Sequence, residues 1–152
     1  MALRRALVAI FGVLIADQAL KFYIKTTYYL HRSEPLIGDW FYLNFVENPG
    51  MAFGLAFGGD TGKLILTSVR IIASVVIALY LRKLLREQAH MGLIMCVAII
   101  FAGAVGNIID SVFYGLLFNE SSPTPLNGVA DFLPEEGGYG TFFFGKVVDM
   151  FE

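Results

Sequence analysis

Three aspartates lie in or beside long apolar stretches of this 152-residue chain, where a carboxylate is costly. Asp17 and Asp110 interrupt runs of aliphatic residues, and Asp149 follows an aromatic and valine stretch near the last residue. An ionised group at the centre of a membrane helix costs roughly 2.5 to 3.5 kcal/mol on insertion scales, so such groups pair with a partner or perform a function. Several of them in one short apolar chain suggest acid–base chemistry at a membrane surface.

An amide shares a predicted helix face with one of these carboxylates. Gly103, Asn107 and Asp110 are spaced i, i+4 and i+7, which places them on one side of a helix. We expect Gly103 to admit a neighbouring helix, so that the amide and the carboxylate point into a helix–helix seam. Two interpretations stay open, a polar contact that holds helices together and a part in a functional site.

Two further groups have a structural and a functional interpretation. Asp17 and Lys21 form an i, i+4 pair with the acid on the N-terminal side, the favourable order. The pair can stabilise a helix end, or Asp17 can support a site in the outer half of the membrane. Asn48, within Asn48-Pro49-Gly50, is by default a turn former and alternatively a clamp for the backbone of an extended ligand.

The composition favours a membrane protein. Hydrophobic residues make up 57% of the chain and charged residues 16%, against about a quarter in soluble domains. Three spans are predicted, at about residues 6–23, 64–81 and 91–117, each near the roughly 20 residues that a transmembrane helix needs. The first continues to Tyr23 without a small-x-small cleavage site, so we interpret it as a retained helix and not as a signal peptide. Arg70, in the second span, is expected to extend toward the membrane surface.

The outward parts of the chain are predicted from charge and strand propensity. The positive-inside rule places both Arg4-Arg5 and the link Arg82–Arg86 in the cytoplasm, so segments 25–62 and 118–152 face outward. The aromatic, β-branched stretch 39–46, followed by a turn and the apolar, glycine-rich stretch 51–58, predicts a small β cradle on the outer face. The fold class is therefore mostly α, an integral membrane helical bundle forming one domain, 1–152.

Helical rise places the polar groups at one depth. Asp17 lies eleven residues after Ala6, about 16 Å along a helix, and Asn107 lies sixteen residues after Met91, about 24 Å along. Together with Asp110 and Asp149, both therefore belong to the outer leaflet.

Other chemistries find little support. His31 and His90 lie far apart and have no metal-ligand spacing, so we expect no metal and no cofactor. The basic residues form no stripe of the kind that binds nucleic acid. An oligomer is not expected.

At four places the chain resembles the lipoprotein signal peptidases (signal peptidase II). The stretches are Asp17-Gln18-Ala19-Leu20-Lys21, Asn48-Pro49-Gly50-Met51-Ala52-Phe53, Gly103-Ala104-Val105-Gly106-Asn107-Ile108-Ile109-Asp110 and Val147-Val148-Asp149. They occur in the family's order and cover nearly the whole chain. The resemblance implies a four-helix, multi-pass aspartic peptidase of the bacterial inner membrane, with its site facing the outer side. Its partners would be membrane lipid and a diacylglyceryl-modified prolipoprotein, which it cuts just before the lipidated cysteine.

The resemblance also implies roles for individual residues. Asp149 takes the position of one of two catalytic aspartates, and the supporting positions around the site fall on Asp17, Asn48, Asn107 and Asp110. Two close carboxylates share one proton. The ionised one activates a water, and the protonated one donates to the scissile carbonyl.

The sequence departs from the family twice. Ser111 stands where the family often has arginine, which removes one ion pair. The second aspartate, in an Asn-x-Ala-Asp-Ser motif, does not appear between Asp149 and Glu152, and Asn127-Gly-Val-Ala-Asp131 resembles that motif only superficially. We therefore expect an incomplete form without the fourth helix, inactive or nearly so. The alternatives are a non-catalytic membrane scaffold or lipid-binding protein, and a small transporter, although no inverted repeat is visible.

Overall fold

The computed structural model describes the backbone of residues 1–49 and 59–151. The predicted turn at Gly50 and the glycine-rich stretch 51–58 lie outside the described residues, as does the side chain of Asn127.

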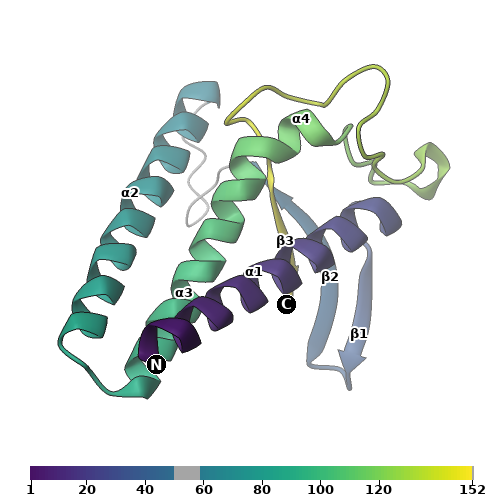
Figure 1. Cartoon of the computed structure of the whole chain (residues 1–152). Helices are drawn as coiled ribbons and strands as arrows, with labels where there is room; N and C mark the ends of the chain where they lie inside the picture. Colours follow the sequence, from purple (N-terminus) through teal and green to yellow (C-terminus); the bar gives the residue numbers. More distant parts are fainter. Residues whose placement is uncertain (50–58, 152) are drawn as a thin grey trace.

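Three long helices form the frame of the molecule (Figure 1). They are α1 (Ala2–Thr27), α2 (Gly59–Arg86) and α3 (Met91–Ile109). Helix α3 continues into a π-helical turn, η1 (Asp110–Tyr114), and the short helix α4 (Gly115–Leu117). Within the described chain, three stretches are long and apolar enough to cross a membrane: Ala2–Thr27, Thr61–Arg86 and Met91–Leu117. The predicted membrane helices are thereby confirmed. The first two extend past the predicted spans, because the helix hydrogen bonding continues beyond the apolar run.

The three helices pack around one core. Helices α2 and α3 run antiparallel and are joined by a short turn, and α1 crosses α3 with its first residue near that turn (Figure 1). The helix-bundle core consists of Ala6, Ile10, Leu81, Leu84, Ile94, Val97, Ala98 and Ala102. His90 caps α3, because its Nδ1 accepts the backbone N–H of Gly92 at 3.2 Å.

A small antiparallel sheet lies beside the helices. Its strands are β1 (Ser33–Ile37), β2 (Phe41–Asn48) and β3 (Val147–Phe151), in that order across the sheet. The predicted strand 39–46 is shifted, since β2 runs to Asn48, which pairs with Val147. Asn48 is thus the last residue of β2, and the remainder of the turn predicted after it lies outside the described residues. Its pairing partner on β3 lies almost a hundred residues later in the chain.

The two faces of the sheet have different surroundings. Val148 and Met150 of β3 are buried in a second core beside Ile24 of α1 and Tyr114 of η1. Side chains alternate along a strand, so Asp149 lies on the opposite face. That face carries the candidate catalytic carboxylate.

The long loop between α4 and β3 is held at several points. Leu30 donates its backbone N–H to Ser122 O at 2.7 Å, and Tyr139 donates to Phe118 O at 2.9 Å. Near β3, Gly145 donates to Ser111 O at 2.9 Å, and a Cβ atom at Gly145 would lie 1.9 Å from the carbonyl oxygen of Asp110. Only glycine lets the returning chain approach η1 this closely.

Candidate functional site

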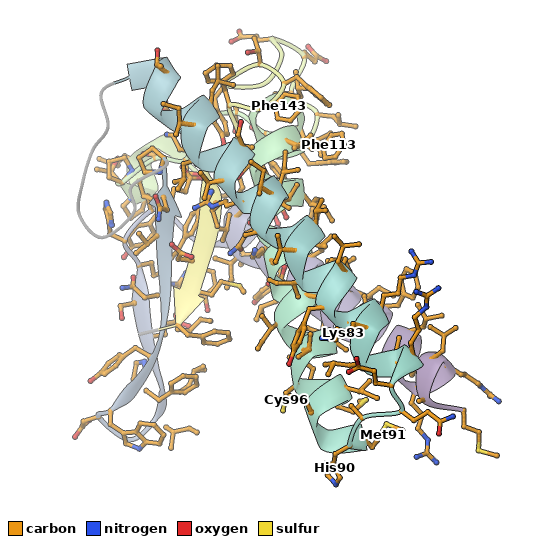
Figure 2. All side chains as sticks on the ribbon, turned by 90° about the vertical axis from the view of Figure 1, so that its left-hand side faces the viewer. Lys83, His90, Met91, Cys96, Phe113 and Phe143 are labelled. Carbon is orange, nitrogen blue, oxygen red and sulfur yellow. The ribbon has the colours of Figure 1, made fainter. Side chains whose placement is uncertain are left out.

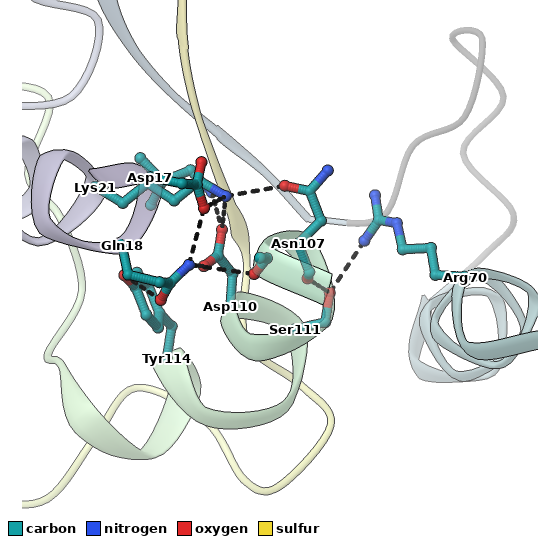
Figure 3. Close-up of polar contacts among 10 residues, drawn as sticks. Asp17, Gln18, Lys21, Arg70, Asn107, Asp110, Ser111 and Tyr114 are labelled. Atoms are coloured by element: carbon teal, nitrogen blue, oxygen red, sulfur yellow. Dashed lines mark hydrogen bonds and ion pairs between the residues drawn. The ribbon is translucent and has the colours of Figure 1, made fainter. Parts of the chain in front are cut away.

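Asp110 stands at the first position of the π-helical turn η1 and is fully buried. A π-turn is wider than an α-turn and often occurs at functional sites. Here it directs Asp110 and Tyr114 to the same neighbour on α1. Gln18 donates from Nε2 to Asp110 Oδ1 at 3.0 Å, and Tyr114 donates its hydroxyl to Gln18 Oε1 at 3.3 Å (Figure 3).

Lys21 lies at the centre of this group, between α1 and α3 (Figure 3). Its Nζ is 2.7 Å from Asp110 Oδ2, 2.9 Å from Asn107 Oδ1 and 3.2 Å from Asp17 Oδ2. An ammonium has three N–H donors, and Lys21 meets three acceptors. The lysine thus does more than pair with Asp17 along one helix, because it joins two helices. We call the group formed by Asp17, Gln18, Lys21, Asn107, Asp110 and Tyr114 the polar centre.

The glycine that admits α1 is Gly106, so the expectation for Gly103 is wrong. A Cβ atom at Gly106 would lie 2.3 Å from Asp17 Oδ2, whereas nothing lies within 4 Å of one at Gly103. The reason is the spacing of the small buried residues along α3. Ala98, Ala102 and Gly106 are buried at intervals of four residues, and Asp110 follows four residues later. This small-xxx-small pattern is visible in the sequence and would have identified the correct glycine.

The sheet is joined to the polar centre through one backbone group. The N–H of Val148 donates to Asp110 Oδ2 at 3.3 Å. Asp149 therefore directly follows a residue that contacts the polar centre. Its own side chain is exposed and, among the described residues, makes no hydrogen bond to Asp17 or Asn107. The structure thus joins Asp17, Asn107 and Asp110 through Lys21, and it reaches Asp149 through Val148.

Asn48 shares the sheet face of Asp149. Asn48 is opposite Val147, and Val147 and Asp149 point to the same side of β3. Asn48 and Asp149 are therefore diagonal neighbours, roughly 7 to 8 Å apart by strand geometry. This places the predicted ligand clamp beside the predicted catalytic group.

Arg70 of α2, which was expected to extend toward the membrane surface, contacts the turn that follows α3. Its Nη1 donates to Ser111 Oγ at 3.0 Å, and Ser111 donates in turn to Asn107 O at 2.9 Å (Figure 3). Arg70 also lies within electrostatic range of the carboxylates of Asp149 and Asp110. Two carboxylates and a hydroxyl are better partners for a guanidinium than the hydrocarbon around the helix. Arg70 of α2 thus brings to Ser111 a positive charge that the serine itself does not carry.

Sequence reasoning gave no place in the site to three of these residues. Gln18 lies between Asp17 and Lys21, and only the pair formed by those two residues was interpreted. Tyr114 is four residues after Asp110, a spacing that favours a shared face. For Arg70, the signal was its charge inside an apolar span.

A second polar cluster fastens the sheet and the loop to the end of α1. Lys25 pairs with Glu47 of β2, both side chains being buried, and donates to Ser121 Oγ at 2.9 Å. Lys146 lies 3.6 Å from Glu47 Oε2 and 2.7 Å from Glu120 Oε1. Burial lowers the pKa of Lys146, but its bonds to the two glutamates outweigh this, and the net pKa is raised. The hydrogen bond from Lys146, followed by its charge, lowers the pKa of Glu120.

The loop aspartate of the superficial motif takes part in a local contact. Asn119 donates to Asp131 Oδ2 at 3.2 Å and accepts the backbone N–H of Asp131 at 2.7 Å. Across residues 1–49 and 59–151, no three side chains of His, Cys, Asp or Glu are grouped to hold a metal ion.

These features define a class of protein. Three helices able to cross a membrane surround a buried ion network, and a small sheet brings an exposed aspartate next to it. The chain is a multi-pass membrane protein with a carboxylate-rich polar centre at a helix seam.

Comparison with known proteins gives the family. The family model of signal peptidase (SPase) II matches residues 9–152. A lipoprotein signal peptidase of Porphyromonas gingivalis is 44% identical over 140 residues, which are 91% of this chain and 58% of that protein. One of Amoebophilus asiaticus is 35% identical over 147 residues, 94% of this chain and 56% of that protein. The chain belongs to the signal peptidase II family, and it spans less than three fifths of the length of these two relatives.

A solved structure of a bacterial membrane enzyme, obtained by the in meso method, has a similar fold. Its TM-score is 0.61 at 22% identity, over 97% of this chain and 69% of the enzyme. At this identity the likeness concerns the fold alone.

Proposed function

We propose that the protein is an aspartic endopeptidase that removes the signal peptide from diacylglyceryl-modified prolipoproteins, cutting just before the lipidated cysteine. Membership of the signal peptidase II family supports signal-peptide removal. The observation that carries the proposal for the site is the bond from the Val148 amide to Asp110, because it fastens the strand that bears Asp149 to the polar centre.

Asp149 is the carboxylate best placed for reaction with a substrate. Its side chain is exposed, whereas Asp110 is fully buried and accepts from Gln18, Lys21 and Val148. A carboxylate whose lone pairs are already occupied is poorly placed to take a proton from water. In the proposed reaction, Asp149 shares one proton with a second carboxylate. One of the pair takes a proton from the attacking water, and the other donates its proton to the substrate and so helps the amine leave.

Two amides are proposed to hold the substrate. The side-chain oxygen of Asn107 accepts from Lys21, while no partner for its Nδ2 is found in the described part of the chain. That N–H₂ group can donate to a substrate carbonyl. Asn48, beside Asp149 on the sheet, is placed to bind the backbone of an extended signal peptide.

The test is processing of a lipidated precursor by the protein expressed from its full coding sequence. We expect Asp149→Asn to abolish cleavage while the protein still inserts into the membrane. The matched control is Asp131→Asn, an isosteric change of an exposed loop aspartate that contacts Asn119, and it should leave cleavage intact. Normal cleavage by the Asp149 variant would exclude Asp149 as a catalytic group, whereas absence of cleavage by the parent would favour a non-catalytic lipid-binding protein.

We also propose that the protein lies in the bacterial inner membrane with the polar centre toward the outer side. The end of α2 carries Arg82, Lys83 and Arg86, which the positive-inside rule assigns to the cytoplasm. In a Cys96→Ser background, a membrane-impermeant thiol reagent should label Glu135→Cys from outside intact cells. It should label Gln88→Cys only after permeabilisation, and the reverse pattern would contradict the orientation.

A further inference from the structure

Two adjoining cavities lie at the end of the helix bundle where α1 begins and where α2 turns into α3. One, of about 640 Å³, lies between all three helices and is lined by Arg82, Arg86 and residues of α1 and α3. The other, of about 690 Å³, lies between α1 and α3 and is lined by Arg4 and Arg5. Met1 and Met91 line both cavities, so they adjoin.

The charge around these cavities is uncompensated. None of the four arginine side chains has a hydrogen bond or ion pair within the residues that the structure describes, and no Asp or Glu lines either cavity. The nearby acid Glu87 pairs with Lys83 at 3.8 Å. Figure 2 shows nitrogen-bearing side chains gathered at this end of the bundle, near the labelled Lys83 and Met91. Four positive charges without partners attract an anion.

The cavities also have apolar walls. Leu85 and Ile94 line the first, and Val8 and Met95 line the second. Ile94 belongs to the helix-bundle core, so the first cavity ends directly on apolar packing. A ligand that fills such a space has both a charged group and a hydrocarbon part.

The start of α1 adds to the attraction for an anion. Its N-cap, Met1, makes no side-chain capping bond, and the first turn contains no acidic residue. The first backbone N–H groups of a helix carry partial positive charge, and Ala2 and Leu3 of this turn line the first cavity.

We propose that the paired cavities bind an anionic phospholipid, with a phosphate held by Arg82 and Arg86 and an acyl chain along the apolar walls. A lipid with two phosphates fills both cavities, its second phosphate meeting Arg4 and Arg5. Guanidinium groups bind phosphate oxygens in pairs, and basic pockets between membrane helices on the cytoplasmic side are suited to such headgroups. Topology alone requires only positive charge, not a cavity between arginines. The site lies away from the polar centre, so it does not depend on the proposed peptidase activity.

The experiment is native mass spectrometry of the protein in mild detergent. The added lipids are phosphatidylglycerol, diphosphatidylglycerol and phosphatidylcholine, with glycerol 3-phosphate as the soluble phosphate probe. We expect one anionic lipid to be retained per protein, in preference to phosphatidylcholine. Diphosphatidylglycerol should bind more tightly than phosphatidylglycerol.

The variants locate the site. Arg82→Gln/Arg86→Gln should weaken binding of both anionic lipids by about tenfold or more, from roughly 1 kcal/mol per basic group. Arg4→Gln/Arg5→Gln should weaken diphosphatidylglycerol to the level of phosphatidylglycerol. The control Lys83→Gln lies on the same turn and should bind like the parent. If the glutamine variants do not fold, Arg82→Lys/Arg86→Lys keeps the charge and should bind more weakly than the parent.

Three outcomes would overturn the proposal. They are equal retention of phosphatidylcholine, unchanged binding after the Arg82 and Arg86 substitutions, and binding of glycerol 3-phosphate as tight as that of the lipids. The last result would indicate a site for free phosphate.

Discussion

Lys21 of α1 and Asp110 of η1 form an ion pair 2.7 Å long whose side chains are 3% and 0% exposed. The pair joins two membrane helices at the level where the sheet arrives. A buried ion pair is weak support for stability as a unit, yet each member is strongly needed once the other is present.

Replacing Lys21 should therefore destabilise the protein more than replacing both members. Lys21→Met leaves the buried carboxylate of Asp110 without its cation, and we expect a loss of about 3 to 5 kcal/mol in the free energy of unfolding. The double variant Lys21→Met/Asp110→Leu should lose less. Unfolding in detergent micelles measures both, and equal or greater loss in the double variant would contradict this account.

A methyl group added at Gly106 should separate α1 from α3. Its Cβ would lie 2.3 Å from Asp17 Oδ2, so the carboxylate or the helix must move, and we expect Gly106→Ala to cost about 1 to 3 kcal/mol. Gly103→Ala, on the same helix and with nothing within 4 Å, is the control and should be neutral or slightly stabilising. Similar unfolding midpoints for the two variants would show that the seam is loose at Gly106.

The contact between Glu120 and Lys146 should depend on pH in a defined direction. The pKa of Glu120 is lowered from 4.5 by the hydrogen bond and charge of Lys146, so its contribution is present above 4.5 and is lost as pH falls through the lowered value. The raised pKa of Lys146 extends the contact above 10.5 on the basic side. An NMR titration of the Glu120 carboxyl carbon should give a midpoint below 4.5, which returns toward 4.5 in Lys146→Met. A midpoint at or above 4.5 in the parent would contradict the contact.

If the proposed peptidase activity holds, Arg70 should matter more than the serine to which it donates. Arg70→Gln removes a charged hydrogen bond to Ser111 and a cation in range of Asp149, so we expect processing to fall by roughly tenfold or more. Ser111→Ala keeps the cation and should have a smaller effect, and Arg70→Lys should restore part of the activity. Equal rates for Arg70→Gln and the parent would leave Arg70 a packing role only.

The membrane helices and the depth of the polar groups could be read from the sequence, because both follow from length and rise along a helix. Asp17, Asn107 and Asp110 were expected at one level, and Lys21 joins all three. The ends of the helices could not be read, since hydrophobicity marks the bilayer and not the end of hydrogen bonding.

Contacts between residues that lie far apart along the chain could not be predicted from the sequence. The pairing of Asn48 with Val147 could not be predicted, because the two residues lie almost a hundred positions apart. The contact between Arg70 and Ser111 could not be predicted, because it forms only after α2 and α3 pack together. Gly106 was passed over for Gly103, although the four-residue spacing of Ala98, Ala102 and Gly106 marks it in the sequence.

The bond between the Val148 amide and Asp110 has a consequence for the order in which the molecule is made. Asp149 leaves the ribosome after all three membrane helices, and its strand docks on a carboxylate that α1 and α3 have already enclosed. We therefore expect the face that carries Asp149 to assemble only after the helices have paired in the bilayer.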